Sequence, residues 1–245
     1  VTFLAIAPAF ASAQLITFET TPGAGIPVDD SFLTTPYALS GGGTVGFYFD
    51  NNLSNSFDPG IDTFPVFERT GPDGNNAFTG YLGVSDAPDP LDALQLGDWF
   101  LRQSQPGPAP PPFIVDYNTL QTITGLSGEI WDIDGNPSFT EQWVVDVLDA
   151  SGSVLATQTS PLGDNLAFDA RAWTFGFSGL PAGVDKVRLT FTGSKTTGIG
   201  LAFNNFSPFT VPEPSTLVLA TVALLGGIGL AARRRSTSPP SRLPI

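Results

Sequence analysis

Histidine, cysteine and methionine are absent from this chain of 245 residues. Without histidine and cysteine, the chain has no Ser-His-Asp triad, no cysteine nucleophile, no thiolate or imidazole zinc site and no disulfide framework. Only carboxylates, hydroxyls, two lysines and the arginines remain for chemistry. The lack of cysteine assigns no compartment, because an exported protein of this length can rely on its hydrophobic core instead of disulfides.

Basic residues are scarce and unevenly placed. Ten basic residues stand against 23 acidic ones, which gives a net charge of −13 and makes nucleic acid an unsuitable partner. Four of the ten, Arg233, Arg234, Arg235 and Arg242, lie in the last thirteen positions, so residues 14–210 hold six basic and 22 acidic residues. We interpret this anionic body as an exported, soluble surface; the alternative is a surface that binds cations.

The N-terminus has the pattern of a secretory signal. Residues 1–10 are mostly apolar and are followed by Ala11-Ser12-Ala13, a small-x-small run of the kind that signal peptidase cuts. We therefore expect residues 1–13 to be a signal-peptide remnant. Because a basic region and an initiator methionine are missing, we expect that the sequence is truncated upstream or begins at an alternative start codon. The alternative is that this segment is a buried first strand.

The C-terminus has the pattern of a membrane anchor. Residues 215–232 are eighteen uncharged residues, which as a helix would span about 27 Å, close to the roughly 30 Å core of a bilayer. The cluster Arg233-Arg234-Arg235 predicts that this end stays in the cytoplasm with residues 236–245 as its tail. The expected protein is single-pass with its body outside; a buried core helix is the alternative.

A specific motif precedes this apolar segment. Pro212-Glu213-Pro214, the apolar run and the arginine cluster resemble, in order and spacing over residues 211–235, the PEP-CTERM sorting signal of exported bacterial proteins. The resemblance implies processing near the tripeptide by an exosortase, a membrane transpeptidase, followed by a surface or extracellular location. It also implies extracellular polysaccharide as a candidate ligand. Two prolines disfavour helix around Glu213 and leave an extended peptide that an enzyme can engage.

The body, residues 14–210, is predicted to be one all-β domain, an antiparallel sandwich. Short alternating runs punctuated by Gly, Pro, Asn and Asp recur, and no convincing amphipathic helix is present. The clearest strands are 143–147 and 154–158, joined as a hairpin, then 173–177, 187–191 and a last strand from Ile199 that ends at Asn204-Asn205-Phe206. Weaker candidates are 15–19, 44–49, 77–82 and 99–102. The five prolines within 103–112 predict an extended loop inside one domain.

Residues 130–206 also resemble the galactose-binding jelly rolls often found ahead of this sorting signal. The shared features are the acidic strand end Asp132-Ile133-Asp134, a tryptophan strand with a glycine hairpin, and Asn204-Asn205 where those modules have an Asp-Asn-like pair. Calcium, the only cofactor that these oxygen-rich side chains invite, would by this resemblance lie between Glu19 and Asn204 or Asn205. Ordinary turn chemistry explains the same loop residues without a metal.

No catalytic constellation is recognisable in the body. Paired carboxylates could serve a glycosidase, but 22 acidic residues offer such pairs by chance, and none of Glu19, Glu68, Glu129 and Glu141 lies in a catalytic motif. We expect no enzyme but a non-catalytic binding or structural module. A lectin-like carbohydrate-binding module is the alternative. Trp131, Trp143 and Trp173 lie on predicted strands and are predicted core residues, whereas the position of Trp99 is less constrained.

The signal-peptide pattern makes a direct prediction. N-terminal sequencing of exported protein should begin at Gln14, because Ala11-Ser12-Ala13 supplies the small residues that signal peptidase requires. In intact cells the body should be degraded by added protease. An uncut N-terminus on exported material, or a body that external protease cannot reach, would contradict this assignment.

Overall fold

A computed structural model of the chain describes residues 12–70, 96–105, 109–119, 122–164, 170–196, 199 and 202–211. Within these ranges the chain forms twelve strands and no helix. The described residues fall in one compact unit that runs to Val211. The predicted strand 77–82 and the predicted membrane helix 215–232 lie outside the described residues, as does most of the predicted signal segment.

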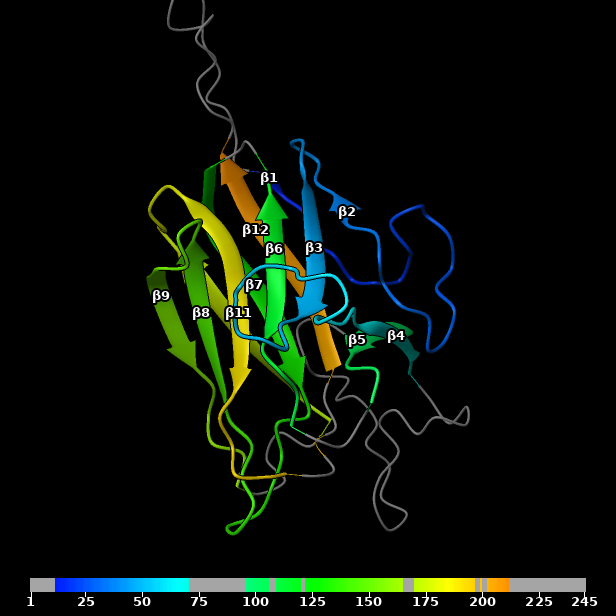
Figure 1. Ribbon diagram of the computed structural model, residues 1–245, viewed down its shortest axis with the longest axis vertical. Coiled ribbons are helices and arrows are strands. Elements are labelled where there is room, and N and C mark those ends of the chain that lie inside the picture. Colours follow the sequence, from blue (N-terminus) through cyan, green and yellow to red (C-terminus); the bar gives the residue numbers. More distant parts are fainter. Residues whose placement is uncertain are drawn as a thin grey trace, which may run out of the picture. The chain divides into compact units, whose positions relative to one another are not determined.

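Two antiparallel sheets of six strands make a β-sandwich (Figure 1). The first sheet has the order β10-β7-β12-β5-β4, with the short β1 added to β12. Its strands are β1 (Ser12–Ala13), β4 (Val66–Arg69), β5 (Trp99–Arg102), β7 (Thr122–Trp131), β10 (Ala172–Ser178) and β12 (Ala202–Val211). The second sheet has the order β2-β3-β6-β11-β8-β9. Its strands are β2 (Tyr37–Ala38), β3 (Thr44–Phe49), β6 (Phe113–Asn118), β8 (Trp143–Asp149), β9 (Val154–Thr159) and β11 (Val184–Phe191).

The sequence predicted the all-β class and several of these strands. Strands β3 and β5 have the predicted bounds, and β8 and β9 form the predicted hairpin, with β8 two residues and β9 one residue longer than predicted. The predicted runs 173–177 and 187–191 lie within β10 and β11. The proline-containing segment 103–112 connects β5 of the first sheet to β6 of the second.

Two strand predictions were wrong. Residues 15–19 form no strand but only an isolated bridge between Ile16 and Phe206, because Phe18 has a left-handed φ of 61° that interrupts an extended backbone. The last strand does not end at Asn204-Asn205-Phe206. Asn205, with a φ of 53°, lies in a bulge, after which β12 resumes its pairing with β7 and continues to Val211.

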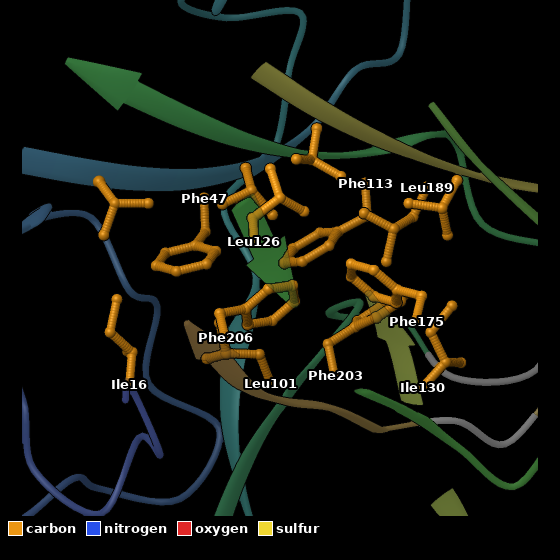
Figure 2. Packing of buried hydrophobic residues seen from close by; sticks show 14 of the residues in the cluster. Ile16, Phe47, Leu101, Phe113, Leu126, Ile130, Phe175, Leu189, Phe203 and Phe206 are labelled. Atoms are coloured by element: carbon orange, nitrogen blue, oxygen red, sulfur yellow. The ribbon is translucent and has the colours of Figure 1, made fainter. Parts of the chain in front are cut away.

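Aromatic side chains fill the space between the sheets. Phe203 of β12 stacks on Phe113 of β6 with ring centroids 4.2 Å apart and an interplanar angle of 10°. Phe206 lies 5.4 Å from Phe47 of the second sheet and 6.2 Å from Phe175 of the first. Figure 2 shows these rings from both sheets converging with aliphatic side chains such as Leu126, Ile130 and Leu189. Burial of these rings stabilises a chain that has no disulfide.

A glycine in β7 makes room for two of these rings. A Cβ atom at Gly128 would lie 2.6 Å from Cζ of Phe175 and 2.7 Å from Cδ1 of Phe206. Any side chain at this position would therefore displace core rings. The glycine is required by close packing here, although glycine weakens an isolated strand.

Gln158 links the two sheets at their edges. Strands β9 and β10 are the terminal strands of the second and first sheets. The side-chain amide of Gln158 donates to the carbonyl of Gly176 at 2.7 Å and accepts from its N–H at 3.0 Å. This two-bond contact satisfies backbone groups of an edge strand that would otherwise be open to another chain.

Residues Ser12 and Ala13 pair with Thr210 and Phe209 of β12. If signal peptidase cuts before Gln14, β1 leaves with the signal and the body begins at Gln14. That residue is held firmly: its amide donates to the carbonyl of Ala38 at 2.9 Å and accepts from the N–H of Ser40 at 2.6 Å.

The aromatic core yields a stability prediction. Replacing the fully buried Phe203 with alanine should lower the free energy of unfolding by about 3–5 kcal/mol, because a stacked core ring is replaced by a cavity. Urea denaturation of the full chain measures this loss. Phe139→Ala is the control: that side chain is 55% exposed, and its removal should cost about 0.5 kcal/mol or less. Equal losses in the two variants would contradict the central role of Phe203.

Candidate functional site

The outer face of the second sheet is partly covered by the segment that follows β3, residues 50–63, which we term the covering loop. Figure 1 shows this segment, in cyan, crossing in front of β6 and β11. Two contacts agree: Asn55 Oδ1 accepts from Nη1 of Arg188 in β11 at 3.1 Å, and the Phe57 ring meets Tyr48 of β3 edge-on at 5.5 Å. Ile114 of β6 alternates with core residues and so faces outward, yet it is fully buried.

Two buried carboxylates organise the covering loop. Asp50 accepts three backbone N–H bonds, from Asn52 at 3.3 Å, Ser54 at 3.1 Å and Asn55 at 2.7 Å. Asp62 accepts the N–H groups of Asn51 and Asp58, both at 2.8 Å. These contacts are the turn chemistry that favours Asp and Asn in loops.

A hollow of about 230 Å³ lies on one side of the covering loop, and we term it the Tyr48 hollow. Its floor is the outer face of β3 and β6, its walls are aromatic or aliphatic, and its polar groups are hydroxyls, one amide and one carboxylate. The lining residues are Leu33, Thr34, Thr35, Pro36, Thr44, Gly46, Phe47, Tyr48, Phe57, Phe64, Asp116 and Asn118. The Tyr48 hydroxyl, which is buried, has no hydrogen-bond partner in the described residues. Burial, followed by nearby carboxylates beginning with Asp116, raises the pKa of Tyr48, so the hydroxyl stays protonated.

A second hollow, of about 340 Å³, lies against residues Leu53 and Asn55 of the covering loop. We term it the Arg188 hollow. Nη2 of Arg188 donates to Asp146 at 2.8 Å, and Asp146 in turn accepts from the Thr157 hydroxyl at 2.7 Å. The Arg188 charge is therefore already paired within the protein.

The residues predicted to bind calcium have protein partners. Glu19 Oε1 accepts the N–H groups of Asp98 at 3.0 Å and Trp99 at 3.3 Å. Asn204 donates to the carbonyl of Leu96 at 2.5 Å and makes a longer contact of 3.4 Å with that of Trp99. Glu19 and Asn204 thus hold the same segment, which leads into β5. Burial raises the pKa of Glu19 above its usual value.

Asn205 takes part in a different network. Its amide donates to Oε2 of Glu129 at 2.6 Å, and the Trp131 indole donates to the same oxygen at 3.0 Å. All three residues are buried. Among the described residues, no group of three or more His, Cys, Asp or Glu side chains is arranged to hold a metal ion. Calcium at Glu19, Asn204 and Asn205 stays a prediction from the sequence.

A lysine neutralises the acidic strand end that the resemblance singled out. Nζ of Lys195 lies 2.8 Å from Oδ1 of Asp134 and 2.7 Å from Oε1 of Glu141. Asp132, which has a left-handed φ of 67°, accepts the N–H of Ala170 at 3.1 Å. The sequence pattern gave no sign that the second of only two lysines would reach this cluster.

Glu141 is the most unusual carboxylate in the described residues. It is completely buried, and its Oε2 has no hydrogen-bond partner there. Burial raises the pKa of Glu141 to about 8, even though Lys195 lowers it. Asp134 and Asp132 raise it further, so the folded protein holds this proton much more tightly than an unfolded chain does.

The predicted tryptophan positions are partly confirmed. Trp131 and Trp143 are fully buried, and Trp173 is half-buried against the core. Trp99, which we considered the best candidate for stacking on a sugar ring, is also buried in the core. The covering loop contributes Phe57, whose half-buried ring stacks at 4.6 Å on the half-buried ring of Phe64, the residue after the loop.

The sorting motif is confirmed by comparison with known protein families. Residues 210–235 match the PEP-CTERM protein-sorting motif. This motif marks an exported protein that is processed by exosortase, a membrane enzyme, on its way to the surface or the extracellular space. No curated protein matches the chain significantly.

Of the matched segment, the structure describes only Thr210 and Val211, the end of β12. Pro212, Glu213, Pro214 and the cluster Arg233-Arg234-Arg235 lie outside the described residues. None of the residues that are described forms a helix with the length and apolar character needed to cross a membrane. The predicted single-pass anchor at 215–232 stays a prediction.

The buried Glu141 predicts a pH dependence of stability. Its pKa is about 8 in the folded protein and 4.5 ordinarily, so the folded state binds more protons between these values and the free energy of unfolding should fall as pH rises. Since the chain has no histidine or cysteine, few other groups titrate between pH 6 and 9.

Melting temperatures of the full chain across this range should therefore decline, and Glu141→Gln, which cannot ionise, should show a flatter profile. Asp58→Asn is a suitable control, because hydrogen bonds from Asn52 and Ser54 lower the pKa of that exposed carboxyl and keep it ionised throughout. A profile for Glu141→Gln as steep as that of the parent chain would contradict the assignment.

Proposed function

We propose that this chain is an exosortase-processed protein whose β-sandwich serves as a non-catalytic binding or structural module at the cell surface or in the extracellular matrix. The observation that carries the proposal is the sorting motif over residues 210–235. On this proposal the signal peptide is removed before Gln14, the apolar segment 215–232 holds the precursor in the membrane, and exosortase acts near Pro212-Glu213-Pro214.

The position of the motif in the fold supports this order of events. Strand β12 ends at Val211, and the proline-flanked tripeptide begins with the next residue. Strand β12 is the middle strand of the first sheet and pairs with both β7 and β5. A cut at the tripeptide therefore releases an intact sandwich, since every described strand precedes Pro212.

The contacts of the glutamates support a non-catalytic body. Each of the four body glutamates has a partner among the described residues. Glu19 caps the turn before β5, Glu68 pairs with Arg102 at 2.6 Å, Glu129 accepts from Trp131, and Glu141 pairs with Lys195.

The strand connections support a jelly-roll-like topology as the finer description. From β5 onward the chain passes back and forth between the two sheets, with only the β8–β9 hairpin staying in one sheet. Such crossing between sheets is the feature that separates jelly rolls from simple meanders.

A lectin-like role is the second candidate. The observation that favours it is the pair of hollows on the outer face of the second sheet, one of them lined by aromatic rings, hydroxyls and a carboxylate. Apolar walls with a few placed polar groups are the usual form of a small-molecule site.

Replacing Pro212-Glu213-Pro214 with three alanines tests the sorting proposal. The variant should remain as a longer, membrane-retained species, because exosortase no longer meets its recognition sequence. Immunoblots of membrane and extracellular fractions measure this. As the control, Pro239→Ala with Pro240→Ala removes two prolines from the tail outside the matched motif and should be processed normally. A triple-alanine variant of unchanged size and location would leave only an ordinary membrane anchor.

A further inference from the structure

The Tyr48 hollow exists because one strand position lacks a side chain. Gly46 stands on the outer face of β3, directly opposite Asp116 of β6. A Cβ atom built there would meet nothing within 4 Å, and the glycine has no left-handed φ that would require it. The backbone of Gly46 therefore forms the open floor of the hollow. Because glycine weakens a strand, the stability of the fold does not explain why glycine occupies this position.

The walls around this floor combine two kinds of surface. Phe57 and Phe64 are half-buried rings, stacked on each other and held by the edge contact of Phe57 with Tyr48. Facing them, Asp116 and the exposed Asn118 present a carboxylate and an amide from β6, and Thr44 presents a hydroxyl from β3. Rings beside a few convergent hydrogen-bonding groups suit a compact ligand with an apolar face and several hydroxyls.

The charge of the lining residues narrows the class of suitable ligands further. Asp116 is the only lining residue that carries a charge, because Tyr48 stays protonated, and the Asp116 side chain is 37% exposed. Lys186 lies 3.6 Å from it but contacts Asp185 as well, so this cation is shared. In a chain of net charge −13 such a site repels anions, while a neutral hydroxyl can donate to the carboxylate.

We infer that the Tyr48 hollow is a binding site for one neutral sugar ring, with Phe57 and Phe64 against the face of the ring and Asp116 and Asn118 bonding its hydroxyls. The inference rests on the proposed binding role of the body and gives that role a ligand class. At about 230 Å³ the hollow is smaller than the roughly 300 Å³ at which sites for drug-sized ligands begin, so it accommodates a single ring.

Ligand-observed NMR on the purified full chain tests the site, with methyl glycosides of glucose, galactose and mannose and their neutral disaccharides as probes. Saturable binding of at least one neutral probe is expected, and glucuronate, which adds a carboxylate to the glucose ring, should bind at least about tenfold more weakly than glucose. Binding of disaccharides alone would also support the site and would identify a polymer as the source of the ring. No binding by any neutral probe, or equal binding of glucuronate, would overturn the inference.

Gly46→Val tests the location, because its Cβ atom would meet nothing within 4 Å, its methyl groups would occupy the floor, and valine favours a strand. It should weaken sugar binding by at least about tenfold while the melting temperature is maintained. The control is Gly176→Val on β10, where a Cβ atom would also meet nothing closer than 3.9 Å, and which should bind like the parent chain. Sugar binding that survives Gly46→Val would place the ligand elsewhere and overturn the inference.

Asp116→Asn provides a second variant if valine at position 46 prevents folding. It keeps the shape of the side chain, removes the charged acceptor and leaves Lys186 its contact with Asp185. Neutral sugars should bind more weakly and the discrimination against glucuronate should shrink; unchanged values of both would contradict the role of Asp116.

Fractionation of cells that carry these variants keeps the tests separate, since Gly46→Val should be sorted normally whether or not the protein binds sugar.

Discussion

The stacking of Phe203 on Phe113 is the contact on which the rest of the body depends. It joins β12, the middle strand of the first sheet, to β6, which lies inside the second, in a chain without disulfides. Phe49 touches both rings, at 6.2 Å and 5.0 Å, and is the last residue of β3. The next residue, Asp50, begins the covering loop. Core packing therefore fixes the position at which the covering loop begins. Each such ring pair contributes about 0.5–1.5 kcal/mol of stability in addition to the hydrophobic contribution of the area that it buries.

Strands whose alternation is visible in the sequence could be predicted, and strands shaped by distant contacts could not. Strand β3 alternates cleanly because one face meets the core. Strand β6 follows a run of prolines, and its first three residues are buried on both faces because the covering loop lies over Ile114, so they show no alternation. Strand β7 contains Gly125 and Gly128, and in the sequence two such glycines suggest a turn. The structure shows instead that core rings occupy the space beside Gly128. The sorting motif, by contrast, is a linear pattern, so it could be predicted from the sequence alone.

The candidate sites show the same division. Asp and Asn at loop positions are expected both for calcium and for turns, and sequence alone does not separate the two uses. In the structure, Glu19 and Asn204 hold the segment before β5, and Asn205 bonds Glu129. The Tyr48 hollow could not have been predicted, because a glycine on β3, an aspartate on β6 and the rings of Phe57 and Phe64 must meet to form it. Only the pairing of Gly46 with Asp116 brings them together.

The use of charge in this body follows from how few cations it has. Residues 14–210 hold six basic residues, and the ion pairs with carboxylates seen in the described part of the body include those of Arg102, Lys186, Arg188 and Lys195. Acidic residues exceed these partners, and several of the surplus carboxylates, such as Asp50 and Asp62, accept backbone N–H bonds instead. Carboxylates thus order the loops while the cations are engaged in ion pairs. A surface of this kind repels anionic partners, and the proposed binding of a neutral ligand would depend instead on shape and hydrogen bonds.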